Sequence, residues 1–294
     1  MKFTTLIDAQ RLAEHLHNPA WVIFDCRFTL TDAEAGQNAY ALAHIPGARY
    51  VHLNHDLAGP VTATSGRHPL PDPATLAQKL GAWGVDADKQ VVVYDDSFGA
   101  IATRMWWMLR WLGHDAVALL DGGLPKWRRL GYETTVQVTE INSCDFIAQP
   151  RRELWVDTAQ VQEALSSKVP LLDARAEIRF TGDREPLDKV AGHIPGSYNR
   201  PFEDNLGPAG DFLGAEELRE SYEETLNGEI PMRSIHLCGS GVTACHNLLA
   251  MEIAGISGGK LYPGSWSEWI TDASRPVAVG EVGEVGEVGD QACA

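Results

Sequence analysis

Residues 238–245 combine a cysteine with the type of backbone that binds anions. The segment reads Cys238-Gly239-Ser240-Gly241-Val242-Thr243-Ala244-Cys245, between a short apolar run and a stretch of helical composition, 243–253. Its glycines let the chain curl so that successive N–H groups, including those of Val242 and Thr243, point inward, and the start of a helix adds partial positive charge. Helix N-termini lower thiol pKa values from about 8.5 toward roughly 3.5 to 7.5, which favours a thiolate there. The loop therefore predicts a nucleophile, Cys238, within an anion-binding cradle.

Other chemistries of a cysteine loop fit these residues less well. A cysteine-based phosphatase needs an arginine six positions later, and this chain has Ala244 there. A Walker loop needs Gly-Lys-Ser/Thr, and the segment has no lysine. A Cys-His protease has partners far away in sequence, so spacing does not exclude it, but nothing favours it. Cys245 is either a resolving cysteine, which would make a thiol redox enzyme, or a small buried residue.

One series of segments occurs twice, in the same order, about 140 to 150 residues apart. The pairs are Phe24–Arg27 with Leu172–Arg175, Ala43–Ala48 with Gly192–Ser197, Val91–Asp95 with Ser234–Cys238 and, more weakly, Leu120–Gly123 with Leu261–Gly264. The copies differ at the end of one strand, where the first has Asp95 and the second Cys238. We therefore expect the second copy to carry the chemistry. His44 and His193 occur in both copies and are expected to serve the fold.

Each half alternates short β-branched runs, such as Trp21–Phe24 and Val91–Tyr94, with helical stretches, such as Ala100–Leu112 and Thr158–Leu165. This pattern predicts an α/β protein of two tandem domains, each a parallel sheet flanked by helices. We expect an inactive N-terminal domain at 1–140, a catalytic domain at 153–276 and a linker near 134–154. Val-Gly-Glu repeats predict a disordered acidic tail at 277–294.

Composition limits the partners. The net charge of −16 argues against nucleic acid, and an anionic substrate would need a few local arginines to offset the overall field. Five cysteines, an odd number in a chain that does not need stapling, fit reduced thiols in a cytoplasmic protein. We see no signal peptide and no apolar stretch near the roughly 18 residues of a membrane span, and we expect no metal or cofactor.

The loop, the doubled His-Ile-Pro-Gly element, Asp173-Ala174-Arg175, Met105–Met108 and Gly264–Trp269 together resemble the two-domain rhodanese family of sulfurtransferases. The likeness runs from Thr5 to about Pro276, and the loop is most similar to that of the 3-mercaptopyruvate sulfurtransferases. It implies a ping-pong reaction in which donor sulfur becomes a persulfide on Cys238. The sulfur then passes to a thiophilic acceptor such as thioredoxin, a small thiol or cyanide. A non-catalytic binding protein with this fold is the alternative from another class.

The resemblance also implies roles for single residues. Thiosulfate enzymes of the family usually have two basic residues after the cysteine, whereas this chain has Gly239 and Ser240, which favours mercaptopyruvate and leaves thiosulfate as a second donor.

Two family arginines hold the donor carboxylate; Arg179 matches one, Arg184 is the nearest candidate for the other, and Arg200 is a weaker substitute. Ser240 is expected to hydrogen-bond the reacting sulfur or the enolate. His68 is expected to reach across from the first domain and orient Ser240 or carry a proton. The family's carboxylate beside that histidine falls at Asn54, with Asp56 two residues on.

Overall fold

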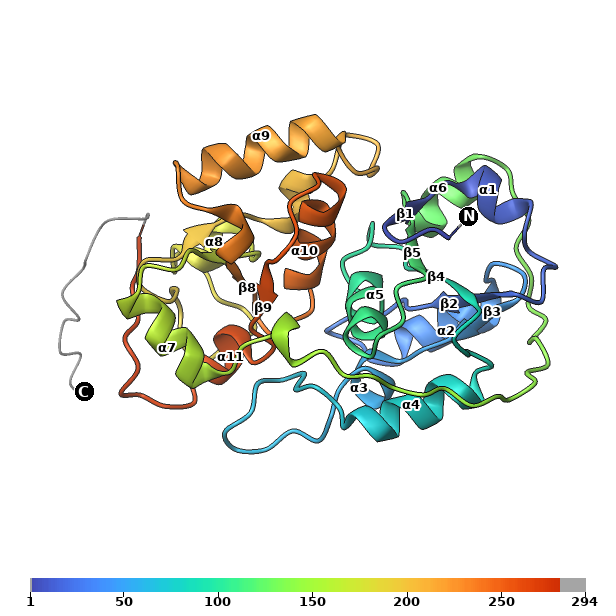
Figure 1. Cartoon of the computed structure of the whole chain (residues 1–294), viewed down its shortest axis with the longest axis horizontal. Helices are drawn as coiled ribbons and strands as arrows, with labels where there is room; N and C mark the ends of the chain where they lie inside the picture. Colours follow the sequence, from blue (N-terminus) through green and yellow to red (C-terminus); the bar gives the residue numbers. More distant parts are fainter. Residues whose placement is uncertain (1, 281–294) are drawn as a thin grey trace.

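The computed structural model describes residues 2–280 of the chain, and its two halves lie side by side (Figure 1). Most of the tail predicted at 277–294 lies outside the described residues. Residues 277–280 belong to the described chain and pack on the second half. Ala278 exchanges backbone hydrogen bonds with His193, and the Gly280 N–H donates to the Thr181 carbonyl. The described chain therefore continues past the predicted start of the tail.

The first half contains a five-stranded parallel sheet in the order β1-β5-β4-β2-β3. Its strands are β1 (Leu6–Ile7), β2 (Trp21–Asp25), β3 (Ala48–Tyr50), β4 (Gln90–Tyr94) and β5 (Val117–Leu120). Its helices are α1 (Ala9–Ala13), α2 (Ala35–Leu42), α3 (Leu53–Asp56), α4 (Pro73–Ala82), α5 (Ala102–Trp111) and α6 (Gly123–Arg129). Alternate β4 side chains enter different cores: Val91 and Val93 pack with α4 and α5, and Val92 and Tyr94 pack on the opposite face. A sheet buried on both faces explains the continuous apolar run.

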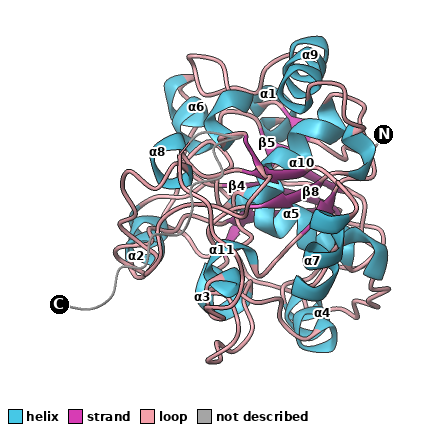
Figure 2. Ribbon diagram, turned by 90° about the vertical axis from the view of Figure 1, so that its left-hand side faces the viewer, coloured by secondary structure: helices cyan, strands magenta, loops and turns pink. Residues whose placement is uncertain are grey.

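The second half contains a four-stranded parallel sheet in the order β7-β6-β8-β9. Its strands are β6 (Leu171–Asp173), β7 (Tyr198–Asn199), β8 (Ile235–Leu237) and β9 (Lys260–Leu261). Its helices are α7 (Thr158–Ser166), α8 (Glu177–Phe180), α9 (Ala215–Leu226), α10 (Ala244–Ile253) and α11 (Ser265–Trp269), with 3-10 turns at Arg152–Leu154, Phe202–Asn205 and Pro231–Arg233. One face of this sheet packs against α7 and α11, and the other against α9 and α10. The predicted parallel sheet in each half is confirmed, and Figure 2 shows the helices around the strands.

The halves are joined through buried side chains. Helices α5 and α10 face each other at the boundary, and one apolar core includes residues of both, among them Met105 and Leu249 (Figure 1). Residues 134–154 run along the first half, where Cys144 and Gln149 donate backbone hydrogen bonds to Gly81 and Leu112. The carboxyl ends of β4 and β8 both lie next to this boundary, which puts the loops after them at the junction of the halves. Within residues 2–280 no helix combines the length and the apolar character that crossing a bilayer requires.

Candidate active site

The loop after β8 holds Cys238 at the boundary between the halves. The Cys238 side chain is 2% exposed, and its Sγ accepts a hydrogen bond from the Gly241 N–H at 3.2 Å. Among the N–H groups of residues 239–243, only that of Gly241 has an acceptor within the described residues. Gly241 has φ +76°, and a Cβ there would lie 2.4 Å from the Pro263 carbonyl oxygen, so this position needs glycine. The loop thus places one N–H on the sulfur and leaves neighbouring N–H groups free.

The corresponding loop of the first half shows what such a cradle binds. The buried Asp95 carboxylate accepts four backbone hydrogen bonds, from Ser97 and Gly99 to Oδ1 and from Ile101 and Ala102 to Oδ2, at 2.8 to 2.9 Å. Burial raises the Asp95 pKa, and these four N–H groups oppose that effect. The first copy therefore places a hydrogen-bonded carboxyl group where the second copy places a cysteine.

A hydrogen-bonded chain links the halves beside Cys238. His68 Nδ1 lies 2.7 Å from Ser240 Oγ, and His68 Nε2 lies 3.0 Å from Asn54 Oδ1. Because an amide oxygen can only accept, Nε2 carries the proton and Nδ1 accepts from the Ser240 hydroxyl. Burial, with Arg104 and Arg67 nearby, lowers the His68 pKa to about 3. His68 is therefore neutral near pH 7 and fixes the direction of the Ser240 hydroxyl, while Asn54 supplies no charge to stabilise an imidazolium.

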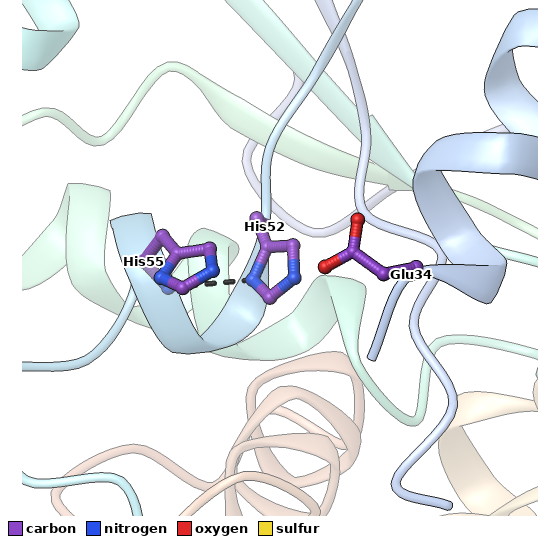
Figure 3. Close-up of side chains that lie close together, drawn as sticks. All are labelled: Glu34, His52 and His55. Carbon is purple, nitrogen blue, oxygen red and sulfur yellow. Dashed lines mark hydrogen bonds between the residues drawn. The ribbon is translucent and has the colours of Figure 1, made fainter. Parts of the chain in front are cut away.

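Asn54 is itself held by a histidine. His52 Nδ1 accepts from the N–H groups of Asn54 and His55 at 3.1 and 3.3 Å and so caps α3, and its Nε2 lies 3.2 Å from the Ala33 carbonyl. His52, His55 and Glu34 lie close enough to share a metal ion (Figure 3). Both ring nitrogens of His52 already have partners, so we interpret this cluster as the support of the short helix that carries Asn54.

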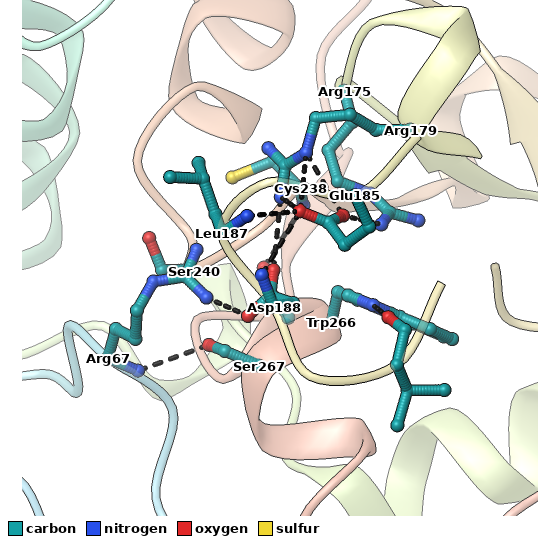
Figure 4. Close-up of polar contacts among 12 residues, drawn as sticks. Arg67, Arg175, Arg179, Glu185, Leu187, Asp188, Cys238, Ser240, Trp266 and Ser267 are labelled. Carbon is teal, nitrogen blue, oxygen red and sulfur yellow. Dashed lines mark hydrogen bonds and ion pairs between the residues drawn. The ribbon is translucent and has the colours of Figure 1, made fainter. Parts of the chain in front are cut away.

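Two guanidinium groups from opposite halves lie next to Gly239. Figure 4 shows the ion pairs around them, with Asp188 between Arg67 and Arg179. A Cβ on Gly239 would lie 2.8 Å from Arg67 Nη2 and 3.4 Å from Arg179 Nη2. Arg179 pairs with Glu185 at 2.9 Å and with Asp188 at 3.0 Å, and Asp188 also pairs with Arg67. Arg67 is fixed by its backbone N–H, which donates to Ser267 Oγ at 3.1 Å. The Asp188 carboxylate thus bridges the two arginines directly beside the Cys238 loop.

The structure distinguishes the other predicted arginines. The side chain of Arg184 is exposed and makes no hydrogen bond or ion pair with residues 2–280. Arg200 is 2% exposed, pairs with Asp204 at 3.1 Å and reaches Asn205 Oδ1 at 3.2 Å, next to α9 rather than at Gly239. Of the arginine candidates, only Arg179 lies at the loop in the described chain, and the second guanidinium there belongs to Arg67.

Cys245 is a buried member of α10. Its Sγ donates to the Gly241 carbonyl at 3.5 Å, and burial raises its pKa to about 12. It is therefore a protonated thiol at neutral pH, which favours its interpretation as a small buried residue over that of a resolving cysteine.

Several site residues were absent from the sequence-based expectations. Arg67, Glu185 and Asp188 belong to the site's ion pairs, and the buried Arg104 of α5 donates to the Gly241 and His68 carbonyls. The sequence offered one indication that Arg67 belongs to the site, namely its position next to His68. The sequence offered no such indication for Arg104, because an arginine in an amphipathic helix is normally expected on the exposed face.

Comparisons with known proteins agree with this geometry. The model of the Rhodanese-like domain matches residues 8–130. A protein of Pseudomonas aeruginosa named "Probable 3-mercaptopyruvate sulfurtransferase" is 49% identical over 284 residues, covering 96% of this chain and 100% of that protein. "Thiosulfate/3-mercaptopyruvate sulfurtransferase 2" of Arabidopsis thaliana is 36% identical over 263 residues, covering 81% of this chain and 75% of that protein. The crystal structure of SseA from Escherichia coli, described as a 3-mercaptopyruvate sulfotransferase, superposes with a TM-score of 0.79 at 32% identity over 90% of this chain and 100% of that one. With 49% and 36% identity to proteins named as sulfurtransferases over most of its length, the chain belongs to the rhodanese family of sulfurtransferases.

Proposed function

We propose that this chain transfers sulfur from 3-mercaptopyruvate to a thiol or cyanide acceptor through a persulfide on Cys238. The observation that carries the proposal is the loop of residues 238–243, which holds one sulfur and leaves N–H groups free for a second. The Asp95 loop supports it, because the same backbone there satisfies a full anion. The free cysteines of the described chain agree with a reducing, cytoplasmic setting.

The first half-reaction moves one sulfur atom. The Cys238 thiolate attacks the thiol sulfur of mercaptopyruvate, an S–S bond forms and the C–S bond of the donor breaks. The electron pair of that bond goes to carbon, giving the enolate of pyruvate, which takes up a proton to become pyruvate. In the second half-reaction an acceptor thiolate or cyanide attacks the outer sulfur, and the electron pair of the S–S bond returns to Cys238 as thiolate.

Charge selects the donor. The Arg67 and Arg179 guanidiniums lie over Gly239, where planar N–H forks can bind a carboxylate bidentately. Asp188 shows that a carboxylate fits between them. A groove of about 660 Å³, lined in part by Asn54, Arg67, His68 and Leu187, lies on the N-terminal side of these groups. This arrangement favours a donor whose carboxylate is a few bonds away from its sulfur.

Ser240 and His68 complete the site. The proton of the Ser240 hydroxyl points to His68, so the hydroxyl oxygen has lone pairs free for the thiol proton of the donor. His68 holds that orientation without a charge of its own. We infer that Ser240 contacts the reacting sulfur and that His68 positions it.

Mass spectrometry of the intact protein tests this function. After incubation with mercaptopyruvate and removal of the excess, we expect a mass gain of one sulfur atom that maps to Cys238 and disappears when cyanide is added. Cys238→Ser should show neither the gain nor pyruvate release. A wild-type protein that gains no sulfur from mercaptopyruvate or thiosulfate would instead be a binding protein, and the loss of two hydrogens would indicate a Cys238–Cys245 disulfide.

Thiosulfate is the second candidate donor. It is favoured by the converging Arg67 and Arg179, which can also hold a small dianion. The ratio of kcat/KM for mercaptopyruvate to that for thiosulfate decides between them, and we expect it to exceed one because the residues after Cys238 carry no charge.

A further inference from the structure

Arg104 is a fully buried cation without a carboxylate partner in the described part of the chain. It lies in the first turn of α5, in the non-catalytic half, and its side chain is 0% exposed. Nη1 donates to the Gly241 carbonyl at 2.8 Å and Nη2 to the His68 carbonyl at 3.0 Å, while the buried Nε has no partner there. The N-terminal turn of a helix disfavours positive charge, and burial of an unpaired charge is costly. A guanidinium kept in this place needs an anion nearby.

The other charges of the site already balance among themselves. Three arginines pair with three carboxylates there: Arg67 with Asp188, Arg179 with Glu185 and Asp188, and Arg175 with Asp173 and Glu185. His68 is neutral because its pKa is about 3. Arginine stays protonated inside proteins, so Arg104 leaves an excess of one positive charge beside the loop.

Two cysteine sulfurs share Gly241 with Arg104, because Cys245 Sγ and Arg104 both donate to its carbonyl and its N–H donates to Cys238 Sγ. Burial lowers the Arg104 pKa, and the groups that oppose this are Cys245 and Cys238. Cys245, with its pKa raised to about 12, remains a neutral thiol, which leaves Cys238. Gly241 connects the two groups, since its N–H donates to Cys238 Sγ and its carbonyl accepts from Arg104. A guanidinium on that carbonyl also polarises the Gly241–Val242 peptide and strengthens the free Val242 N–H as a donor to a second sulfur.

We propose that Arg104 is the buried counter-charge of the anionic sulfur on Cys238, so that the non-catalytic half holds the nucleophile in its reactive form. Arg104 acts through the Gly241 peptide and by its charge, as a positioning residue. The proposal rests on Cys238 being the reactive sulfur, but it does not depend on which donor the enzyme uses.

Alkylation of Cys238 by the neutral reagent iodoacetamide tests the proposal without any sulfur donor. The rate of modification, followed by mass spectrometry of the Cys238 peptide between pH 5 and 10, gives the pH midpoint of reactivity. We expect Arg104→Gln, which keeps an N–H donor but no charge, to raise that midpoint by about one unit, which means about tenfold slower alkylation at low pH. Arg104→Lys, which keeps the charge, should stay near the wild-type midpoint.

Arg110→Gln is the matched control, because Arg110 lies on the same helix and pairs across the boundary with Glu252 at 3.5 Å without touching the loop. Its midpoint should equal that of the wild type. Equal midpoints in wild type, Arg104→Gln and Arg110→Gln would overturn the proposal. It would still stand if the protein failed to make persulfide from mercaptopyruvate, which would count against the proposed function alone.

A second measurement covers the case in which Arg104→Gln does not fold. Cys238→Asp places a fixed anion in the loop, as Asp95 does in the first half, and Cys238→Asn is its uncharged match. With Arg104 present, we expect the Asp variant to have a Tm at least as high as the Asn variant at pH 8. A Tm several degrees lower for the Asp variant would show that no counter-charge is available and would overturn the proposal.

Discussion

At the scale of single residues, the two copies of the loop differ in the side chain that their backbone N–H groups surround. The Asp95 carboxylate accepts hydrogen bonds from four N–H groups of its own half, whereas Cys238 Sγ accepts one. Side chains of the other half contact the neighbouring residues Ser240 and Gly241. The side chains around the Cys238 loop are therefore drawn from both copies, and their separate contributions can be measured by single substitutions.

Arg67 should contribute to donor binding, and Arg184 should not. Charged hydrogen bonds are worth about 1.5 to 3 kcal/mol, so Arg67→Met should raise KM for mercaptopyruvate by roughly 10- to 100-fold with a smaller change in kcat. Arg184→Met is the control, because that side chain is exposed and away from the loop. Steady-state kinetics of both variants would contradict this assignment if Arg184→Met showed the larger effect.

Burial, with Arg104 and Arg67 nearby, keeps His68 neutral, and a carboxylate at position 54 would oppose that effect. In the wild type the His68 pKa is about 3, so we expect no inflection from His68 in the pH profile of kcat between pH 5 and 8. Asn54→Asp puts a carboxylate beside Nε2, which stabilises the imidazolium and raises the His68 pKa. A protonated His68 cannot accept from Ser240, so activity should fall on the acid side of a new inflection. Asn54→Ala should lower activity without that inflection, and matching profiles for the Asp and Ala variants would refute the argument.

At the scale of the elements, the loop after β8 depends on glycine for its shape. Gly241→Ala would combine a φ of +76° with a Cβ only 2.4 Å from the Pro263 carbonyl oxygen, so the N–H on Cys238 Sγ would move away. We expect kcat for sulfur transfer to fall by at least about 100-fold, the scale of losing a preorganised N–H donor.

Gly196→Ala is the control that separates the backbone strain of a positive φ from the displacement of the loop by a steric clash. Gly196 has φ +79° with nothing within 4 Å of an added Cβ, so its substitution adds conformational strain alone. It should lower stability by about 1 kcal/mol and leave activity nearly intact. Similar activity losses in the two variants, measured at a temperature where both are folded, would show that the loop geometry does not matter.

The elements were largely readable from sequence, and the site only in part. The repeat and the β-branched runs predicted the parallel sheets, because a strand buried on both faces must be apolar throughout. α5 begins at Ala102 rather than Ala100, and the Asp95 carboxylate binds the N–H groups of Ile101 and Ala102 at its start. Spacing cannot show that Arg67 and Arg104 reach the loop, because their partners lie more than 100 residues away across the boundary.

At the scale of the whole molecule, the loop of residues 238–243 is surrounded by side chains of both halves. His68, Arg67 and Arg104 all come from the N-terminal half and contact residues 188, 240 and 241 of the second. On the proposed function, the N-terminal half therefore contributes side chains to the site although its own loop carries Asp95 in place of a cysteine. The same buried boundary also contains histidines that couple the fold to pH.

Three buried histidines should make the folded chain sensitive to mild acid. Burial lowers the pKa values of His68, His236 and His246 to about 3, from 6.5 when exposed. Since their folded pKa values lie below the unfolded value, the stability is complete above pH 6.5 and is lost as pH falls from 6.5 toward 3. At pH 5 each histidine costs about 2 kcal/mol, together about 6 kcal/mol, against a typical total stability of about 5 to 15 kcal/mol.

Urea unfolding at pH 7.5, 6 and 5 measures this loss. We expect the free energy of unfolding to drop by about 2.4 kcal/mol from pH 7.5 to 6 and by about 3.6 kcal/mol from pH 6 to 5, so that the loss per pH unit roughly doubles. His246→Gln should reduce the slope by about a third, because one of three proton-binding groups is removed. His17→Asn is the control, since His17 is exposed and its substitution should leave the slope unchanged. Equal stability at pH 7.5 and 5 would mean that these histidines bind protons as readily in the fold as in the unfolded chain. His68 would then be protonated at pH 5 and could no longer accept the Ser240 proton on which the orientation of that hydroxyl depends.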